Sequence, residues 1–100
     1  MAVLKIYNDI VDDQEKLVLQ EAGTDSTTFS DIRDFISNLS PDDPDIDIRL
    51  HCDGGDCVEG WSIYDALRQT DKKISATVEG KCSSIATIII LTAPLEQRYA

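Results

Sequence analysis

The sequence predicts an α/β fold, built from repeated β-α or β-β-α units, in which a mainly parallel sheet is flanked by helices. Three observations support this prediction. Residues 46–52 and 72–78 alternate apolar and polar side chains, as half-buried strands do. Helices are expected after each of these strands, at residues 58–69 and 84–92. An order of strand, helix, strand, helix favours crossover units and a parallel sheet.

The chain before residue 46 is expected to add a strand and a helix. Residues 2–7 are rich in β-favouring side chains and precede Asn8-Asp9, which predicts a short strand and a turn. Residues 16–20 fit either a second short strand or the end of a loop. Ser26 or Thr27 is suited to cap a helix that runs to about Leu39. This helix has apolar residues along one face: Phe29, Ile32, Phe35, Ile36 and Leu39.

Residues 40–45 form a connector, because two prolines and the residues before them disfavour helix. The acidic cluster at residues 42–47 is interpreted as a solvated linker rather than a cation or partner site. In the helix at 58–69, four side chains are expected to pack inward: Val58, Trp61, Tyr64 and Leu67. The helix at 84–92 should end before Pro94.

Length and composition indicate one soluble domain. The chain has 100 residues, of which 42% are hydrophobic and 28% charged. Its net charge of −10 argues against binding to nucleic acid or to anionic membranes, and leaves basic protein partners open. The longest apolar run, residues 85–91, is too short to span a bilayer. Three cysteines without a hydrophobic signal segment favour a reducing, cytoplasmic environment.

Two turns carry the features of a site. Gly54-Gly55 follows the strand at 46–52, and Ser83-Ser84 lies in the segment 80–87, which follows the next strand. Each turn delivers backbone amides or a hydroxyl to the start of a helix. The partial positive charge there favours a developing anion.

These segments resemble the Clp protease proteolytic subunit family of serine peptidases, in particular its phage and prophage relatives that act in head maturation. The family pattern is matched without a gap between the two turns by Gly54-Gly55, Gly60, Ile63-Tyr64-Asp65 and Gly80-x-Cys82-Ser83-Ser84. The resemblance is strong over residues 46–92 and compatible before them. It implies a ClpP/crotonase-like fold. It also implies that residues 1–100 are the N-terminal part of a single such domain.

The resemblance implies that Ser84 is the nucleophile and that the amides of Gly55 and Ile85 form the oxyanion hole. Glycine suits position 55 because the backbone there must approach a substrate carbonyl closely. Ser83 falls at a small-residue position of the motif. The alternative for both serines is a helix N-cap, which serine favours in any strand-to-helix turn.

The family takes its histidine base and its aspartate from sequence beyond the nucleophile, and residues 85–100 contain neither. The 100-residue chain is therefore expected to be an inactive fragment of a longer protein. His51, the only histidine, is interpreted as a polar strand-end residue or a groove wall rather than as the base. Lys81 is interpreted as an exposed turn charge rather than as a lysine base.

A zinc site built from His51, Cys52, Cys57 and Cys82 is an alternative, because histidine and cysteine are the ligands that zinc prefers. The spacing of Cys52 and Cys57 is unusual for paired ligands, and Cys82 stands where the family has alanine. No metal or other cofactor is expected, and buried thiols should act as small hydrophobic groups. Asp53, where the family commonly has proline, and Asp56 would oppose an oxyanion if their side chains pointed inward.

The expected function is therefore a serine endopeptidase of prophage type that hydrolyses peptide bonds through an acyl-enzyme on Ser84. The resemblance implies peptide or unfolded-protein substrates, a homo-oligomeric ring, and phage head proteins or an ATPase as further partners. A non-catalytic scaffold or assembly domain with the same fold is the alternative. A third possibility is a crotonase-like site, in which paired backbone amides hold a thioester enolate. Apart from the oxyanion hole, no feature of the sequence supports it.

Overall fold

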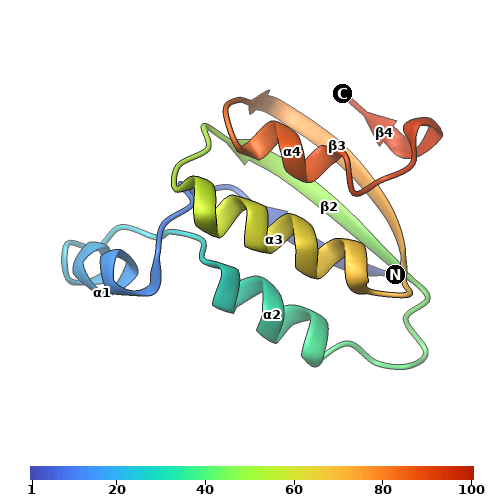
Figure 1. The fold of residues 1–100 in the computed structure, drawn as a ribbon, viewed down its shortest axis with the longest axis horizontal. Coiled ribbons are helices and arrows are strands. Elements are labelled where there is room, and N and C mark those ends of the chain that lie inside the picture. Colours follow the sequence, from blue (N-terminus) through green and yellow to red (C-terminus); the bar gives the residue numbers. More distant parts are fainter.

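Four parallel strands form one sheet in which neighbours in space are also neighbours in the chain (Figure 1). The computed structural model describes residues 1–100. The strands run in the order β1 (Ala2–Ile6), β2 (Asp45–Cys52), β3 (Lys73–Cys82) and β4 (Arg98–Tyr99). This parallel sheet, with helices between its strands, confirms the predicted α/β class.

Five helices lie in the connections between the strands. They are α1 (Asp13–Glu21), α2 (Phe29–Ser37), α3 (Cys57–Gln69), α4 (Ala86–Ile90) and the short 3₁₀ helix η1 (Leu95–Gln97). Because crossovers between parallel strands are right-handed, a sheet in sequential order receives its connecting helices on the same side. Figure 1 shows α3 and α4 in front of the strands, α2 beside α3, and α1 apart at the left. No helix is long and apolar enough to cross a membrane.

The core lies between the strands and these helices. In β2, Leu50 and Cys52 are buried on the helix-covered side, while the alternate residues Arg49 and His51 point to the open face. The open face also carries Val3 and Lys5 of β1 and polar residues of β3, so it is more polar than the helix-covered side. The predicted alternation along β2 is confirmed.

The helix predicted before residue 39 is confirmed, with a different cap. Thr28, rather than Ser26 or Thr27, accepts the Asp31 N–H at 3.1 Å. The Asp31 carboxylate accepts the Thr28 N–H at 3.0 Å, which completes a capping box. The predicted apolar face packs against the core through Phe29, Ile32, Phe35, Ile36 and Leu39.

The prediction of a strand or loop at residues 16–20 was wrong, because these residues belong to α1. This helix buries none of its residues, so no apolar stripe announces it in the sequence. Local and tertiary polar contacts hold it instead. Asp12 accepts the Glu15 N–H at 2.8 Å, and Lys16 Nζ lies 2.6 Å from the Asp31 carboxylate.

The predicted inward face of α3 was wrong in part. Val58 and Trp61 are 73% and 48% exposed, and the buried residues of the helix are Gly60, Ile63 and Leu67. A Cβ on Gly60 would lie 2.3 Å from Cγ1 of Ile85. The helix therefore turns its glycine toward the site, because a larger residue would keep α3 away from Ile85.

The chain after residue 78 differs from the prediction. β3 continues to Cys82, since that residue still pairs with Cys52, and α4 spans only Ala86–Ile90. After Pro94 the chain forms η1 and then β4, which pairs with β3. This last strand was not predicted, because two residues are too few to show an alternating pattern.

Candidate active site

The glycine turn and the serine turn meet at the carboxyl ends of the neighbouring strands β2 and β3. Because the two strands are parallel neighbours, the segments that follow them emerge side by side. A Cβ on Gly54 would lie 2.8 Å from Cβ of Ser84 and 3.3 Å from the backbone nitrogen of Ile85. The structure therefore brings Gly54, the first residue of the glycine pair, against Ser84 and Ile85.

The glycine turn is fixed by the segment that follows β1. The Ile10 N–H donates to the Gly54 carbonyl at 2.9 Å, and the Ile10 carbonyl accepts the Asp56 N–H at 2.8 Å. Gly55 has φ +142°, and a Cβ there would lie 2.0 Å from the Ile10 oxygen. These contacts use the groups on either side of Gly55 and leave its own N–H without an acceptor in the chain.

Ser84 has a left-handed backbone, with φ +55°. Left-handed conformations are uncommon for residues other than glycine and cluster at functional turns. Ser84 is exposed, and its hydroxyl makes no hydrogen bond within the chain. Its carbonyl accepts the Thr87 N–H at 3.0 Å and the Thr87 hydroxyl at 2.6 Å. The N–H of the next residue, Ile85, also has no acceptor in the chain.

The alternative that the serines cap the following helix was wrong. Ile85 precedes α4, and no side chain caps this helix. Ser83 instead joins the two turns. Its N–H donates to the Cys52 carbonyl at 3.2 Å, and its hydroxyl donates to the Asp53 carbonyl at 3.3 Å.

The two aspartates beside the glycine pair are both engaged in other contacts. Asp53 lies 2.9 Å from Nζ of Lys81, so this exposed ion pair also spans the two turns. The hydrogen bond to Asp53 raises the pKa of Lys81. The Asp56 carboxylate caps α3 by accepting the Glu59 N–H at 3.0 Å. Lys81 is thus an exposed charge with a partner, and one of the two flanking carboxylates is balanced by it.

His51 lies on the open face of the sheet. Its Nδ1 pairs with the Glu79 carbonyl, and its ring packs edge-on against Tyr7, with centroids 6.4 Å apart. The Tyr7 hydroxyl donates to the Glu79 carboxylate at 2.6 Å, and this bond raises the pKa of Tyr7. None of these partners belongs to the serine turn. The structure therefore places His51 at a strand end, as the sequence analysis interpreted it.

The three cysteines have different surroundings. Cys52 is buried, Cys82 is half-buried and Cys57 is exposed. The structure contains no group of three or more histidine, cysteine or acidic side chains placed to hold a metal ion. The zinc alternative therefore has no site, because its His51 lies on the opposite side of β2 from Cys52.

Sequence reasoning missed two features of the site. One is the left-handed backbone of Ser84, which no residue type signals. The other is the bridge from Ile10 to Gly55. The sequence does carry a trace of this bridge, because Ile10 and Val11 are an apolar pair in an otherwise polar segment, and both are buried.

The Clp protease family model matches residues 2–100. Among solved structures, ClpP1 from Listeria monocytogenes is 19% identical with a TM-score of 0.73, and the alignment covers 95% of this chain and 48% of that one. A mutant of ClpP1 from Listeria monocytogenes is 20% identical with a TM-score of 0.74, covering 96% of this chain and 48% of that one.

The ClpP protease catalytic domain from Plasmodium falciparum is 20% identical with a TM-score of 0.65, again covering 96% of this chain and 48% of that one. At these identities the structures show a shared fold. The chain spans about half the length of the solved structures that it matches.

Proposed function

The chain belongs to the Clp protease family, and from this premise we propose that it is part of a serine endopeptidase that cleaves peptide bonds through an acyl-enzyme on Ser84. The observation that supports the proposal is the close approach of Gly54, which precedes Gly55 in the glycine turn, to Ser84 and to the Ile85 nitrogen. Acyl transfer requires a nucleophilic hydroxyl and donors for the oxyanion. The Ser84 hydroxyl and the N–H groups of Gly55 and Ile85 have no hydrogen-bond partner in the chain, and they lie in the turns that follow β2 and β3.

In this mechanism the Ser84 oxygen attacks the substrate carbonyl carbon while a base takes the hydroxyl proton. The carbonyl oxygen becomes an oxyanion that accepts hydrogen bonds from the amides of Gly55 and Ile85. Such donors are worth about 3–4 kcal/mol each to the transition state. Collapse of the intermediate expels the amine, which takes up a proton, and water then hydrolyses the acyl-enzyme.

The base is not among residues 1–100 in this proposal. His51 is the only histidine, and its contacts lie on the open sheet face. We propose that the histidine and the aspartate come from the remaining half of a protein as long as the relatives, and that residues 1–100 alone are inactive.

The wider setting is also a proposal. The family resemblance supports peptide or unfolded-protein substrates, a homo-oligomeric ring, a cytoplasmic location and a prophage origin, with phage head proteins or an ATPase as partners. The second candidate is a scaffold or assembly domain that keeps the fold without catalysis. It is kept as an alternative because His51, the only histidine of these residues, contacts Glu79 and Tyr7 and not the serine turn. A crotonase-like enolate site has no residue of its own to support it.

The test is phosphonylation of Ser84 by a fluorophosphonate in the full-length protein that the gene encodes. The wild type and Ser37→Ala, which changes an exposed serine far from the two turns in the sequence, should react at similar rates. Ser84→Ala should lose at least ~100-fold in rate, as expected when an activated nucleophile is removed. Peptide hydrolysis should fall in parallel. Reaction that is equal in Ser84→Ala, or absent in a folded and assembled protein, would favour the scaffold candidate.

A companion test addresses the isolated chain. Residues 1–100 should show no peptide hydrolysis above the level of Ser84→Ala. Hydrolysis that disappears in both Ser84→Ala and His51→Ala would show that His51 acts as the base.

A further inference from the structure

Cys52 and Cys82 face each other across two neighbouring strands. They are paired positions in the β2–β3 ladder, and both are free thiols. Paired strands lie about 4.7–4.9 Å apart, and disulfides join Cα atoms that are about 4.4–6.8 Å apart. The backbone therefore holds these two cysteines within the range that a disulfide needs.

Both side chains lie on the same side of the sheet. Cys52 belongs to the buried core cluster, and Cys82 packs against that cluster. The register shift beside them preserves this arrangement. Leu50 pairs with Val78, and the next pair is Cys52 with Cys82, so residues 79–81 bulge out of the ladder. The strands rejoin at the cysteine pair.

The pair lies beneath the two turns of the site. The Cys52 sulfur accepts the Gly54 N–H at 3.3 Å and donates its own proton to the Asn8 carbonyl at 3.2 Å. Cys82 immediately precedes Ser83, whose N–H donates to the Cys52 carbonyl. A change at either sulfur is therefore transmitted directly to the glycine turn and the serine turn.

We propose that Cys52 and Cys82 are a redox-sensitive pair that an oxidant such as hydrogen peroxide joins as a disulfide beneath the glycine and serine turns. The disulfide itself does not depend on the proposed peptidase function. Its consequence for Ser84 does rest on that function.

The chemistry balances with one peroxide. The Cys82 thiol loses its proton to water, and the thiolate sulfur attacks one peroxide oxygen, which breaks the O–O bond and releases hydroxide. The resulting sulfenic acid is attacked by the sulfur of Cys52, which also gives up its proton, and a second hydroxide leaves. The two hydroxides combine with the two protons, so two thiols lose two electrons and two waters form.

The order of attack follows from exposure. Cys82 is half-buried, whereas only 1% of Cys52 is exposed, so the oxidant meets Cys82 first. Burial raises the pKa of both thiols, and negative charge on Cys52 adds to the effect at Cys82. Little thiolate is present at pH 7, and oxidation should therefore become faster as the pH rises.

Oxidation should alter the site because a disulfide sulfur carries no proton. The bond from Cys52 to the Asn8 carbonyl is then lost, and the sulfur that receives the Gly54 N–H is drawn toward β3. In the full-length protein, the rate of Ser84 phosphonylation should fall at least several-fold on oxidation. Dithiothreitol should restore this rate.

The first experiment uses residues 1–100 with Cys57→Ser, which removes the exposed third thiol. After peroxide treatment at pH 8, trypsin cleavage at the arginines and lysines should leave peptide 50–68 joined to peptide 82–98, at a mass two hydrogens below their sum. Dithiothreitol should separate them. The crosslink should be absent in Cys57→Ser proteins that also carry Cys52→Ser or Cys82→Ser.

Other products would overturn the pairing. A disulfide of Cys57 with either partner in the folded wild type, sulfinic acid at Cys82 without a crosslink, or unchanged thiols after hours at pH 9 would each do so. If Cys52→Ser or Cys82→Ser fails to fold, fragmentation of the crosslinked peptides from Cys57→Ser still locates the bond. A disulfide that leaves the Ser84 rate unchanged overturns the regulatory role, whereas no Ser84 reaction in reduced protein counts against the peptidase proposal itself.

Discussion

Ser84 occupies a backbone conformation that is unfavourable for its side chain. Left-handed residues with a Cβ cost about 1–2 kcal/mol relative to the ordinary helical region. Here the cost is offset by contacts on both sides of the residue, because the Ser84 carbonyl is held by Thr87 and the neighbouring Ser83 is held by Cys52 and Asp53. Ser84 is exposed, and its hydroxyl stays without a hydrogen-bond partner in the chain.

This strain can be measured by substitution. Ser84→Gly should be more stable to urea than Ser84→Ala by about 1 kcal/mol, because glycine adopts positive φ without a steric penalty. The matched pair at Ser83, which has no positive φ, should show the opposite order, since glycine loses more entropy on folding. Equal stability of the two Ser84 variants would mean that position 84 stores no strain.

The sequence could place Ser84 but not describe its backbone. The motif around Gly80 and the register with Gly55 were enough to single out the two turns. The φ of Ser84 depends on hydrogen bonds from residues far away in the sequence, and residue type does not report these. The same reason explains why the Ile10 bridge to Gly55 was missed.

At the scale of elements, the start of α2 is fixed by more side-chain contacts than the start of any other helix. Its capping box joins Thr28 to Asp31, and Lys16 of α1 binds the same carboxylate at 2.6 Å. One acidic side chain therefore holds the start of α2 and the only tertiary ion pair of α1. Losing it should loosen both helices.

Thr28→Ala should lower the free energy of unfolding by about 1–2 kcal/mol, because Thr28 caps the helix and is buried. Thr24→Ala is the matched control, since Thr24 is exposed and its side chain makes no hydrogen bond; it should change stability by less than about 0.5 kcal/mol. Urea unfolding followed by circular dichroism measures both. A Thr28 variant as stable as its control would show that the Thr28 cap does not stabilise α2.

The same carboxylate makes stability depend on pH. Desolvation opposes ionisation of Asp31, but the bonds from Lys16 and Thr28 outweigh it and lower its pKa below the ordinary value of 3.8. A lowered pKa means that the ionised group stabilises the fold above pH 3.8 and that this contribution is lost as the pH falls through the lower, folded value. Wild type should therefore exceed Asp31→Asn in stability at pH 6, and the difference should shrink below pH 4.

Elements with an apolar face were predicted well, and elements without one were not. β2 and α2 have clear periodicity and were placed to within a few residues. α1 buries nothing, and its helix depends on a cap and a salt bridge. For α3 the helix was predicted and Leu67 is buried as expected, but Val58 and Trp61 are exposed. Gly60, which has no apolar side chain to signal it, is buried against Ile85 instead.

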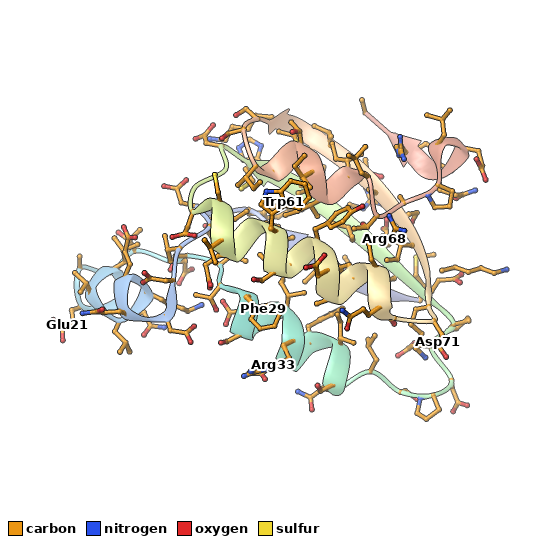
Figure 2. The ribbon with its side chains drawn as sticks, in the orientation of Figure 1. Glu21, Phe29, Arg33, Trp61, Arg68 and Asp71 are labelled. Carbon is orange, nitrogen blue, oxygen red and sulfur yellow. The ribbon has the colours of Figure 1, made fainter.

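At the scale of the whole molecule, α3 exposes large apolar side chains on its outer face. Val58 is 73% exposed and Trp61 48%, and Trp61 packs edge-on against Tyr64, with Arg68 over the Tyr64 ring. Figure 2 shows Trp61 on the side of α3 that lies toward α4 in this view. This face is available to a neighbouring subunit in the proposed ring.

If subunits associate through this face, the sedimentation coefficient should rise with protein concentration, and the fluorescence of Trp61, the only tryptophan, should shift to shorter wavelength. Trp61→Ala should weaken association at least ~10-fold, as aromatic anchors at interface centres do. Gln69→Ala is the control, because Gln69 is an exposed residue of the same helix. Association that is unchanged in Trp61→Ala would place the subunit contact elsewhere.

The most direct test of the central claim is a crystal structure of the full-length protein after reaction with a fluorophosphonate. The claim is that Ser84 and the amides of Gly55 and Ile85 grip a single carbonyl group. It predicts a bond from phosphorus to the Ser84 oxygen, with the phosphonyl oxygen about 2.7–3.1 Å from both amide nitrogens. A phosphonyl group on another side chain, or one on Ser84 whose oxygen points away from both amides, would contradict it.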